Sequence, residues 1–286
     1  MLQLTHRDYF QTTGTGNNWT VQLKRCSKKI LYTYHEELID AARLIHSEAD
    51  SPITLLFSGG IDSEYMLNIF QRANIPFSVA IISYGKYNEH DTNWAFRYCN
   101  SRSINPTIVD IDIDKFISNG DIYTIANSVQ CAAYQIPSIM SGISKLDGTV
   151  VMANGEPYIK NFDGVWKYEE TERVNSYMRW FKNNSIDGTP DFLRYTPEAT
   201  LSFLYDPTVI ELTTNKCPGK LSTRTSKHKI FSQDYNIEPR PKYTGWEQIE
   251  KLKIFKEVTE NFQQLKDNHN GVFELEVSLL KNMLAA

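Results

Sequence analysis

The residues best suited to chemistry are Ser58-Gly-Gly-Ile-Asp-Ser63. The two glycines allow a tight turn and a close approach of the backbone to a ligand, and the serine hydroxyls can donate hydrogen bonds to phosphate oxygens. Asp62 would repel a phosphate unless a divalent cation lay between them, so its carboxylate is predicted to bind Mg²⁺. The ending Gly-Lys-Ser/Thr of the usual P-loop is missing. A glycine turn that merely joins two elements would need neither Asp62 nor both serines.

The flanking sequence places this segment between a strand and a helix. Residues 53–57 form a nearly continuous apolar run, which is typical of a parallel strand buried on both faces. From Glu64 to Ala73 the apolar residues recur at helical spacing. A helix that begins here would point free backbone N–H groups at the loop, and such groups favour an anion. The sequence therefore predicts a phosphate-binding strand, loop and helix.

In this context the six residues resemble the pyrophosphate loop of the N-type ATP pyrophosphatases, or PP-loop enzymes. This family includes asparagine synthetase, GMP synthetase, NAD synthetase, argininosuccinate synthetase and the deazaguanine-forming synthases. The resemblance implies ATP and Mg²⁺ as cofactors, an adenine nucleotide alpha hydrolase-like (HUP-type) fold, and cleavage of ATP between the α and β phosphates with an adenylated intermediate. It also implies which residues hold the departing pyrophosphate: Ser58, Gly59, Gly60, Ile61 and Ser63.

The rest of the first half predicts an α/β fold with a doubly wound parallel sheet. Further strands are expected at residues 77–82, 107–113 and 149–153, with helices at 92–103 and 120–135. Strands that alternate with helices of this length imply right-handed crossovers. Ligands of such sheets bind over the carboxyl ends of the strands, where residues 58–63 and 82–84 lie.

Three further residues near this edge are assigned through the resemblance. It implies that Ile82 meets adenine through its backbone and that Tyr84 covers the ring, although packing of Tyr84 on the sheet edge is an equal alternative. Glu156, in Asn154-Gly-Glu-Pro157, is the nearest match to a carboxylate that shares the cation with the loop aspartate in asparagine synthetase-like relatives. The fuller Gly-Gly-Asp-Glu signature of those relatives is absent, and a turn role for Glu156 competes.

Other acidic residues favour structural interpretations. Asp110, Asp112 and Asp114 alternate with isoleucines and could collect a metal, but a solvated strand face is preferred. His90 and Asp91 precede an expected helix and resemble a polar cluster of some relatives. A helix cap is the preferred role for Asp91.

Cations for the departing pyrophosphate are expected from the C-terminal half, as in PP-loop enzymes generally. Basic residues gather between Lys216 and Lys229, and again at Arg240-Pro-Lys242. Lys229 and Lys242 are the first candidates, followed by Arg240. A solvated basic loop, or one that contacts RNA phosphates, is the alternative.

Three regions are expected along the chain. Residues 1–29 would form a β-hairpin extension with strands at 9–13 and 19–23, and residues 30–160 would form the PP-loop core, beginning with a helix at 30–49. Residues 161–286 would form a mostly helical substrate or closing region. Thr196 is expected to cap a short helix there, and the last helices are expected at 246–266 and 273–284.

Composition limits the class of protein. The 286 residues are 41% hydrophobic, enough for a large core, and the net charge of −4 implies no general attraction to nucleic acid or an anionic membrane. The N-terminus is not a signal peptide and no apolar run approaches membrane-spanning length, which predicts a cytoplasmic protein. The four cysteines are widely separated, so neither a zinc cluster nor a disulfide framework is expected.

Together these features predict an ATP-dependent synthetase that forms AMP and pyrophosphate. It would adenylate a carboxylate or carbonyl oxygen of a small molecule or nucleobase and pass it to ammonia or an amine. Leu2 stands where asparagine synthetase has its catalytic cysteine, and about 50 residues cannot house a glutaminase domain, so the donor is expected free or from a separate protein. Deazaguanine synthase-like or tRNA-modifying activity is an alternative, weakened by the lack of clustered cysteines. A nucleotide-binding regulatory protein without turnover is another.

Overall fold

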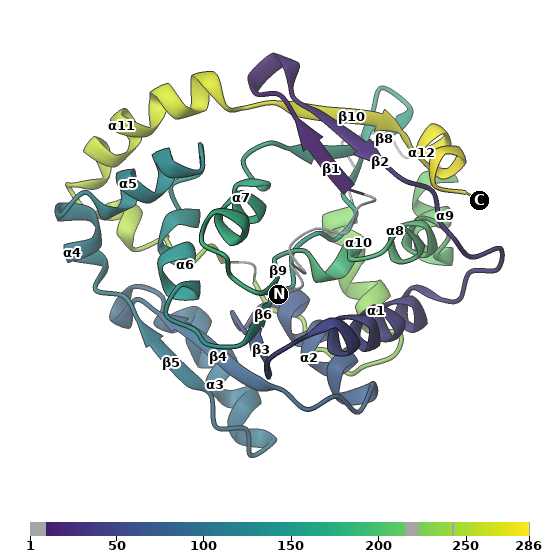
Figure 1. The fold of residues 1–286 in the computed structure, drawn as a ribbon, viewed down its shortest axis with the longest axis horizontal. Helices are drawn as coiled ribbons and strands as arrows, with labels where there is room; N and C mark the ends of the chain where they lie inside the picture. The colour runs from purple at the N-terminus through teal and green to yellow at the C-terminus, as the bar shows by residue number, and fades with distance from the viewer. Residues whose placement is uncertain (1–9, 215–222, 242, 286) are drawn as a thin grey trace.

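A parallel five-stranded sheet organises the computed structural model, which describes residues 10–214, 223–241 and 243–285. The strand order is β5–β4–β3–β6–β9, and every neighbouring pair is parallel (Figure 1). The strands are β3 (Ile53–Leu56), β4 (Ser78–Ser83), β5 (Thr107–Asp110), β6 (Thr149–Val151) and β9 (Gly188–Thr189). The chain runs from central β3 to one side and later returns to β6 on the other side, which confirms the predicted doubly wound α/β class.

Helices cover both faces of this sheet. Leu55 and Val151 point into one buried cluster, whereas Val150 and Met152 point into another, as the alternation of side chains along a strand requires. The first cluster is closed by α1 (Tyr34–Glu48), α2 (Ile61–Arg72), α3 (Glu89–Ser101) and α8 (Pro197–Leu204). The second is closed by α4 (Ile113–Ser118), α5 (Asp121–Ser128), α6 (Ile136–Ile143), α7 (Ser176–Asn183) and α11 (Phe255–Asn268). Two covered faces explain why the strands are apolar without alternation.

The predicted N-terminal hairpin is present as β1 (Phe10–Thr13) and β2 (Thr20–Leu23). Its buried side chains Phe10, Trp19 and Val21 pack with Met178 of α7 and Phe273. Phe273 belongs to a second, antiparallel sheet of β7 (Ile159–Phe162), β8 (Val165–Thr171) and β10 (Val272–Glu276). Figure 1 shows the hairpin lying across β10.

Several predicted C-terminal boundaries were wrong. The expected helix at 273–284 is a strand, β10, followed by the helix α12 (Val277–Leu284), because the alternating residues 272–276 pair with β8. The expected helix at 246–266 is a short 3-10 turn at Ile249–Lys251, and the regular helix α11 begins only at Phe255. The cap predicted at Thr196 is confirmed, since its hydroxyl accepts a hydrogen bond from the Ala199 N–H at 3.1 Å.

Caps also correct two predictions in the first half. α1 begins at Tyr34 and not at Ile30, because Thr33 and Glu36 form a reciprocal capping box. β5 ends at Asp110, and Asp112 caps α4 by accepting a hydrogen bond from the Lys115 N–H at 3.1 Å. The three alternating aspartates therefore do not share a strand face, and all three are exposed.

Within the described residues, no helix combines the length and the apolar character needed to cross a membrane. Cys26, Cys99 and Cys131 are buried free thiols.

The central strand offers a test of the packing. Leu55 is 0% exposed on β3, so Leu55→Ala should lower the free energy of unfolding by about 2–5 kcal/mol through lost burial and a residual cavity. Leu279→Ala on α12 is the matched control, because Leu279 is 49% exposed and its loss should cost about 0.5 kcal/mol or less. Urea unfolding followed by circular dichroism measures both. Equal destabilisation by the two variants would contradict the assignment of β3 to the centre of the core.

Candidate active site

The loop after β3 lies at the point where the strand order of the sheet reverses. Gly59 has a φ of +81°, and a Cβ atom there would lie 2.5 Å from the carbonyl oxygen of Asp91, so this position requires glycine. α2 begins at Ile61, three residues earlier than predicted, which puts Asp62 and Ser63 in its first turn. Gly60 at the N-cap provides no side-chain cap, so the first N–H groups of α2 face the pocket above the loop.

The two serines of the loop face one another. Their hydroxyl oxygens are 3.1 Å apart, and Ser63 also donates to the carbonyl oxygen of Gly60 at 3.0 Å. Ser58 is exposed, whereas Ser63 is buried at the base. The loop therefore combines hydroxyl groups, backbone N–H groups and a helix N-terminus at one place, as an anion site requires.

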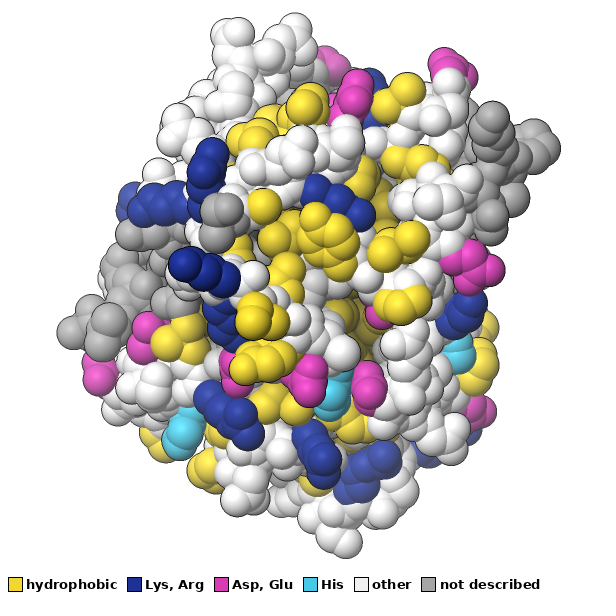
Figure 2. Space-filling model, turned by 90° about the vertical axis from the view of Figure 1, so that its right-hand side faces the viewer, with side chains coloured by type: hydrophobic (Ala, Val, Ile, Leu, Met, Phe, Trp, Pro, Cys, Tyr) yellow, Lys and Arg dark blue, Asp and Glu magenta, His cyan; other side chains and the backbone are white. Residues whose placement is uncertain are grey.

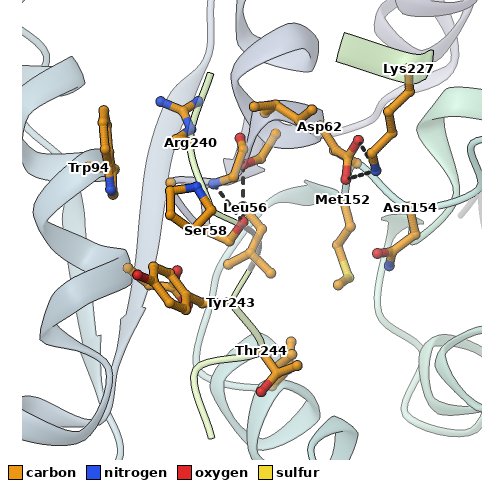
Figure 3. Close-up of a pocket in the computed structure, with 18 of the residues that line it drawn as sticks. Leu56, Ser58, Asp62, Trp94, Met152, Asn154, Lys227, Arg240, Tyr243 and Thr244 are labelled. Carbon is orange, nitrogen blue, oxygen red and sulfur yellow. Dashed lines mark hydrogen bonds and ion pairs between the residues drawn. The ribbon is translucent and has the colours of Figure 1, made fainter. Parts of the chain in front are cut away.

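A pocket of about 420 Å³ opens over this loop. Its walls come from segments far apart in the sequence, namely α3, residues 152–154, α10 (Thr223–Phe231) and residues 239–241 and 243–244. Figure 3 shows Lys227 and Asp62 joined on one side of the pocket, with Trp94, Arg240 and Tyr243 on the other. The volume suits a nucleotide-sized ligand.

Lys227 is the central charged residue of this pocket. Its ammonium nitrogen lies 2.6 Å from Asp62 Oδ1 and 2.9 Å from Glu156 Oε1, and the residue is only 3% exposed. Burial alone would lower the pKa of the Lys227 ammonium, but the charges of Asp62 and Glu156 outweigh this effect and raise that pKa above its ordinary value. The structure thus brings together the two carboxylates that the sequence had assigned to one cation.

Sequence reasoning chose the wrong lysine on α10 for this position. Lys229 is exposed and its ammonium pairs with Glu211 of α9 (Pro207–Thr214) at 3.2 Å, outside the pocket. Lys227 shares a helix face with the buried Ile230 and Phe231, three and four residues on, whereas Lys229 lies on the opposite side. The apolar residues three and four positions after Lys227 are the feature of the sequence that could have predicted its burial.

Of the other two predicted cations, Arg240 lies in the described part of the chain and Lys242 does not. Arg240 lines the pocket, and its guanidinium forms a buried ion pair with Glu64 of α2. Lys242 lies outside the described residues, as does the segment 215–222. Of the three candidates, the structure places Arg240 beside the loop.

The donor set around Lys227 is compatible with a magnesium ion. Asp62 and Glu156 are hard oxygen donors that converge on one cation, here the ammonium group. Mg²⁺ takes one or two protein carboxylates and completes its shell with water and phosphate oxygens. Within the described residues no cluster of three or more histidine, cysteine, aspartate and glutamate side chains could hold a metal alone.

The residues assigned to adenine are placed differently from the prediction. Tyr84 is buried, its hydroxyl hydrogen-bonds with Ser138 at 2.8 Å, and it belongs to the core cluster and not to the pocket lining. The carbonyl oxygen of Ile82 accepts a hydrogen bond from the Asn88 side chain at 3.1 Å. The packing alternative for Tyr84 is therefore the correct one. Trp94, Tyr177 and Tyr243 are the aromatic residues among the described pocket lining.

Asp91 was predicted to cap α3, and that prediction was wrong. α3 begins at Glu89 with Asn88 as its N-cap, so Asp91 lies within the first turn and lines the pocket. Burial raises the pKa of the Asp91 carboxyl to about 6, and the charge of Glu247 adds to this while His90 opposes it. The Asp91 carboxyl therefore changes its charge near pH 6.

Asp91 makes stability depend on pH in a defined direction. Folding raises the pKa of this carboxyl, so its ionisation lowers the free energy of unfolding. This destabilisation is absent below about pH 4, where the carboxyl is protonated in both states, and complete above about pH 6, where it is ionised in both. Asp91→Asn cannot ionise, so its Tm relative to the wild type should rise between pH 4.5 and pH 7.5. The control Asp163→Asn changes an exposed aspartate in a left-handed turn that asparagine tolerates, and its difference should stay constant. A Tm difference for Asp91→Asn that does not change with pH would refute the assignment.

Comparison with known proteins gives similarity in structure only. No family model matches the chain, and no curated protein matches its sequence. The NH3-dependent NAD synthetase of Campylobacter jejuni is 12% identical with a TM-score of 0.37, over 81% of this chain and 93% of that one. The U34-tRNA thiolase NcsA of Methanococcus maripaludis is 11% identical (TM-score 0.35, 81% and 79% of the chains), and the NMN synthetase of Francisella tularensis is 12% identical (0.33, 80% and 94%). At these identities the activity of this chain has to be argued from its own residues.

Proposed function

We propose that this protein is a PP-loop ATP-dependent synthetase that adenylates a carboxylate or carbonyl oxygen and transfers it to ammonia or an amine, releasing AMP and pyrophosphate. The observation that carries the proposal is the Ser58–Ser63 loop at the reversal point of the sheet, which opens into a pocket that also contains Lys227 and Arg240. An anion site with buried cations beside it is suited to a leaving group that gains negative charge.

The loop would bind the two phosphates that leave together. The hydroxyls of Ser58 and Ser63 and the first N–H groups of α2 lie around one concave surface, and no side chain caps the helix; a bound phosphate would replace the carbonyl oxygen of Gly60 as the acceptor from Ser63. Gly59 allows the loop to pack closely against α3, since any side chain at this position would collide with that helix. The groups are held by the backbone, so they need little rearrangement when the phosphates arrive.

Lys227 and Arg240 would stabilise the developing charge. Both reach the pocket from the C-terminal half, and both are buried and held by carboxylates of α2, Lys227 by Asp62 and Arg240 by Glu64. A buried cation stabilises charge more strongly than an exposed one, because less water screens it. Lys227 also holds Asp62 and Glu156 side by side against their mutual repulsion.

Asp62 and Glu156 are the residues that would hold Mg²⁺. The ion, when bound, supplies charge neutralisation at the phosphate oxygens. All other contributions of the chain are binding and alignment by the loop, the cations and the aromatic wall of Trp94 and Tyr243, against which a planar base can stack.

The pocket lining favours transfer to an external amine over sulfur transfer. Cys26, Cys99 and Cys131 are buried elsewhere, and none of the described residues that line the pocket is a cysteine. A thiol nucleophile is therefore not supplied by the described part of the chain. Ammonia or an amine, free or delivered by a partner protein, fits the lining better.

The proposal is tested by the products formed from Mg·ATP. Incubation with candidate carboxylates and nucleobases plus ammonium should give AMP and pyrophosphate in equal amounts, measured by chromatography and a coupled pyrophosphate assay. Asp62→Ala is the negative control and should slow turnover by about 10² or more. Formation of ADP would contradict the proposal. Binding of ATP without any product across the panel would indicate a regulatory protein.

The two lysines of α10 form a matched pair. Lys227→Ala should lower kcat by about 10²–10³ because a preorganised buried cation is lost, whereas Lys229→Ala should stay within about twofold of the wild type. Thermal unfolding of each variant shows whether a loss of kcat reflects a loss of folding. Equal kcat for the two variants, both folded, would remove Lys227 from the mechanism.

A further inference from the structure

A second cavity, of about 480 Å³, lies between the start of α1, the turn that joins α8 to α9, and the segment after α10. It shares no lining residue with the pocket over the loop. Figure 2 shows the face that carries α12, α9 and the start of α1, where hydrophobic side chains gather in a hollow with acidic side chains and a histidine near its lower edge. Tyr32 and Tyr205, which line the cavity, are exposed.

The lining of this second cavity is aromatic and acidic. Four tyrosines contribute to it, together with two carboxylates, Asp206 and Asp234. None of its described lining residues is a lysine or an arginine. Aromatic faces and carboxylates both attract a cation, whereas they disfavour an anion or a nucleotide.

Tyr65 of α2 lines this cavity from within the core. The residue is 0% exposed, and its ring stacks on Phe231 with the centroids 4.2 Å apart. Burial raises the pKa of Tyr65 well above its ordinary value, and the charges of Asp234 and Asp206 add to the effect.

His35 carries an unsatisfied atom beside this cavity. Its Nδ1 is buried without a hydrogen bond, and the nearest oxygen of Asp234 lies 3.7 Å away, beyond hydrogen-bond distance. The ring of His35 packs edge-on against Tyr235, so it is held in this orientation. The cavity therefore offers polar groups of its own to a ligand besides its charge.

Two of the lining rings already attract ammonium groups from the chain itself. Lys28 Nζ lies 5.0 Å from the ring centroid of Tyr32, and Lys281 Nζ lies 4.4 Å from that of Tyr205. Neither lysine lines the cavity. These contacts show that the rings of Tyr32 and Tyr205 are positioned to bind cations.

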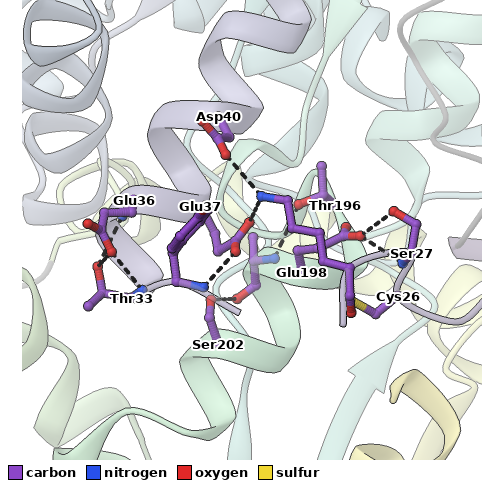
Figure 4. A network of polar contacts seen from close by, with 12 residues as sticks. Cys26, Ser27, Thr33, Glu36, Glu37, Asp40, Thr196, Glu198 and Ser202 are labelled. Carbon is purple, nitrogen blue, oxygen red and sulfur yellow. Dashed lines mark hydrogen bonds and ion pairs between the residues drawn. The ribbon is translucent and has the colours of Figure 1, made fainter. Parts of the chain in front are cut away.

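A network of hydrogen bonds holds the wall of the cavity at the start of α1. Figure 4 shows the network that holds it: Thr33 and Glu36 form the capping box, and the buried Glu37 accepts hydrogen bonds from the Tyr32 N–H at 2.9 Å and from Lys28 Nζ at 2.8 Å. Ser27 is fixed in turn by Glu198 of α8 at 2.8 Å. Preorganisation of this kind lowers the entropic cost of binding.

We propose that the second cavity is a binding site for a small organic cation with one ammonium group on an aromatic or alkyl body. The ammonium group interacts with Asp206 and Asp234, and the body packs against the tyrosine rings. Primary ammonium and quaternary ammonium compounds share this chemistry. The proposal does not depend on the proposed synthetase activity, since the two cavities have no lining residue in common.

The probe is phenethylamine, with 2-phenylethanol as its neutral counterpart, titrated calorimetrically into the full chain at pH 7.5 without nucleotide. The amine should bind with a Kd of about 1 mM or below, and the alcohol about tenfold or more weakly, because only the amine carries a charge. Equal binding of the two, or no binding of the amine up to about 10 mM, would overturn the proposal.

Variants locate the site. Asp234→Asn removes one half-exposed carboxylate and should weaken the amine about fivefold to tenfold, with no change for the alcohol. Asp206→Asn keeps an oxygen that can accept the hydrogen bond from the Thr208 N–H, so the start of α9 is preserved, and it should weaken the amine similarly. The control Asp163→Asn should bind as the wild type does. Unchanged affinity in both folded cavity variants would refute the assignment, whatever the outcome of the ATP assays.

Discussion

The ammonium group of Lys227 between Asp62 and Glu156 is the interaction on which the rest of the pocket depends. It joins α10 to the first turn of α2 and to the turn after β6, three segments that lie far apart in the sequence. Three charges out of water are costly unless they compensate one another, and removal of one partner of a buried pair leaves an uncompensated charge. The alignment of the C-terminal half with the loop is therefore tied to the same groups that would act on the phosphates.

The parallel sheet makes this arrangement possible. β3 lies between β4 and β6, so the loop after β3 has open space above it where the crossovers diverge. α2 begins directly at that loop, and Gly59 lets α3 pack close against it. Arg240 is tied to α2 in the same way as Lys227, because its guanidinium forms a buried ion pair with Glu64 of that helix.

The same two helices form part of both cavities. α2 contributes Asp62 to the pocket over the loop and Tyr65, three residues later, to the second cavity. α10 contributes Lys227 to the first and Ile230 to the second. The stacked rings of Tyr65 and Phe231 join the helices between these positions. Residues three apart lie on the same side of a helix, about 60° apart around its axis and nearly one turn apart along it, so each of the two helices contributes to the two cavities from successive turns.

The sequence by itself determined the features that depend on neighbours in the chain. The apolar runs identified the strands, the glycine and serine pattern identified the tight loop between β3 and α2, and the hairpin was evident from its alternation. What only the tertiary structure decided were contacts between distant segments. Lys227, and not Lys229, forms the ion pair with Asp62. Tyr84 is buried, and its hydroxyl hydrogen-bonds with Ser138. Residues 272–276 form a strand because they pair with the free edge of β8. Local patterns fix the type of an element, but the partner of a side chain depends on how helices are rotated and how strands are ordered, and those are set by packing across the whole chain.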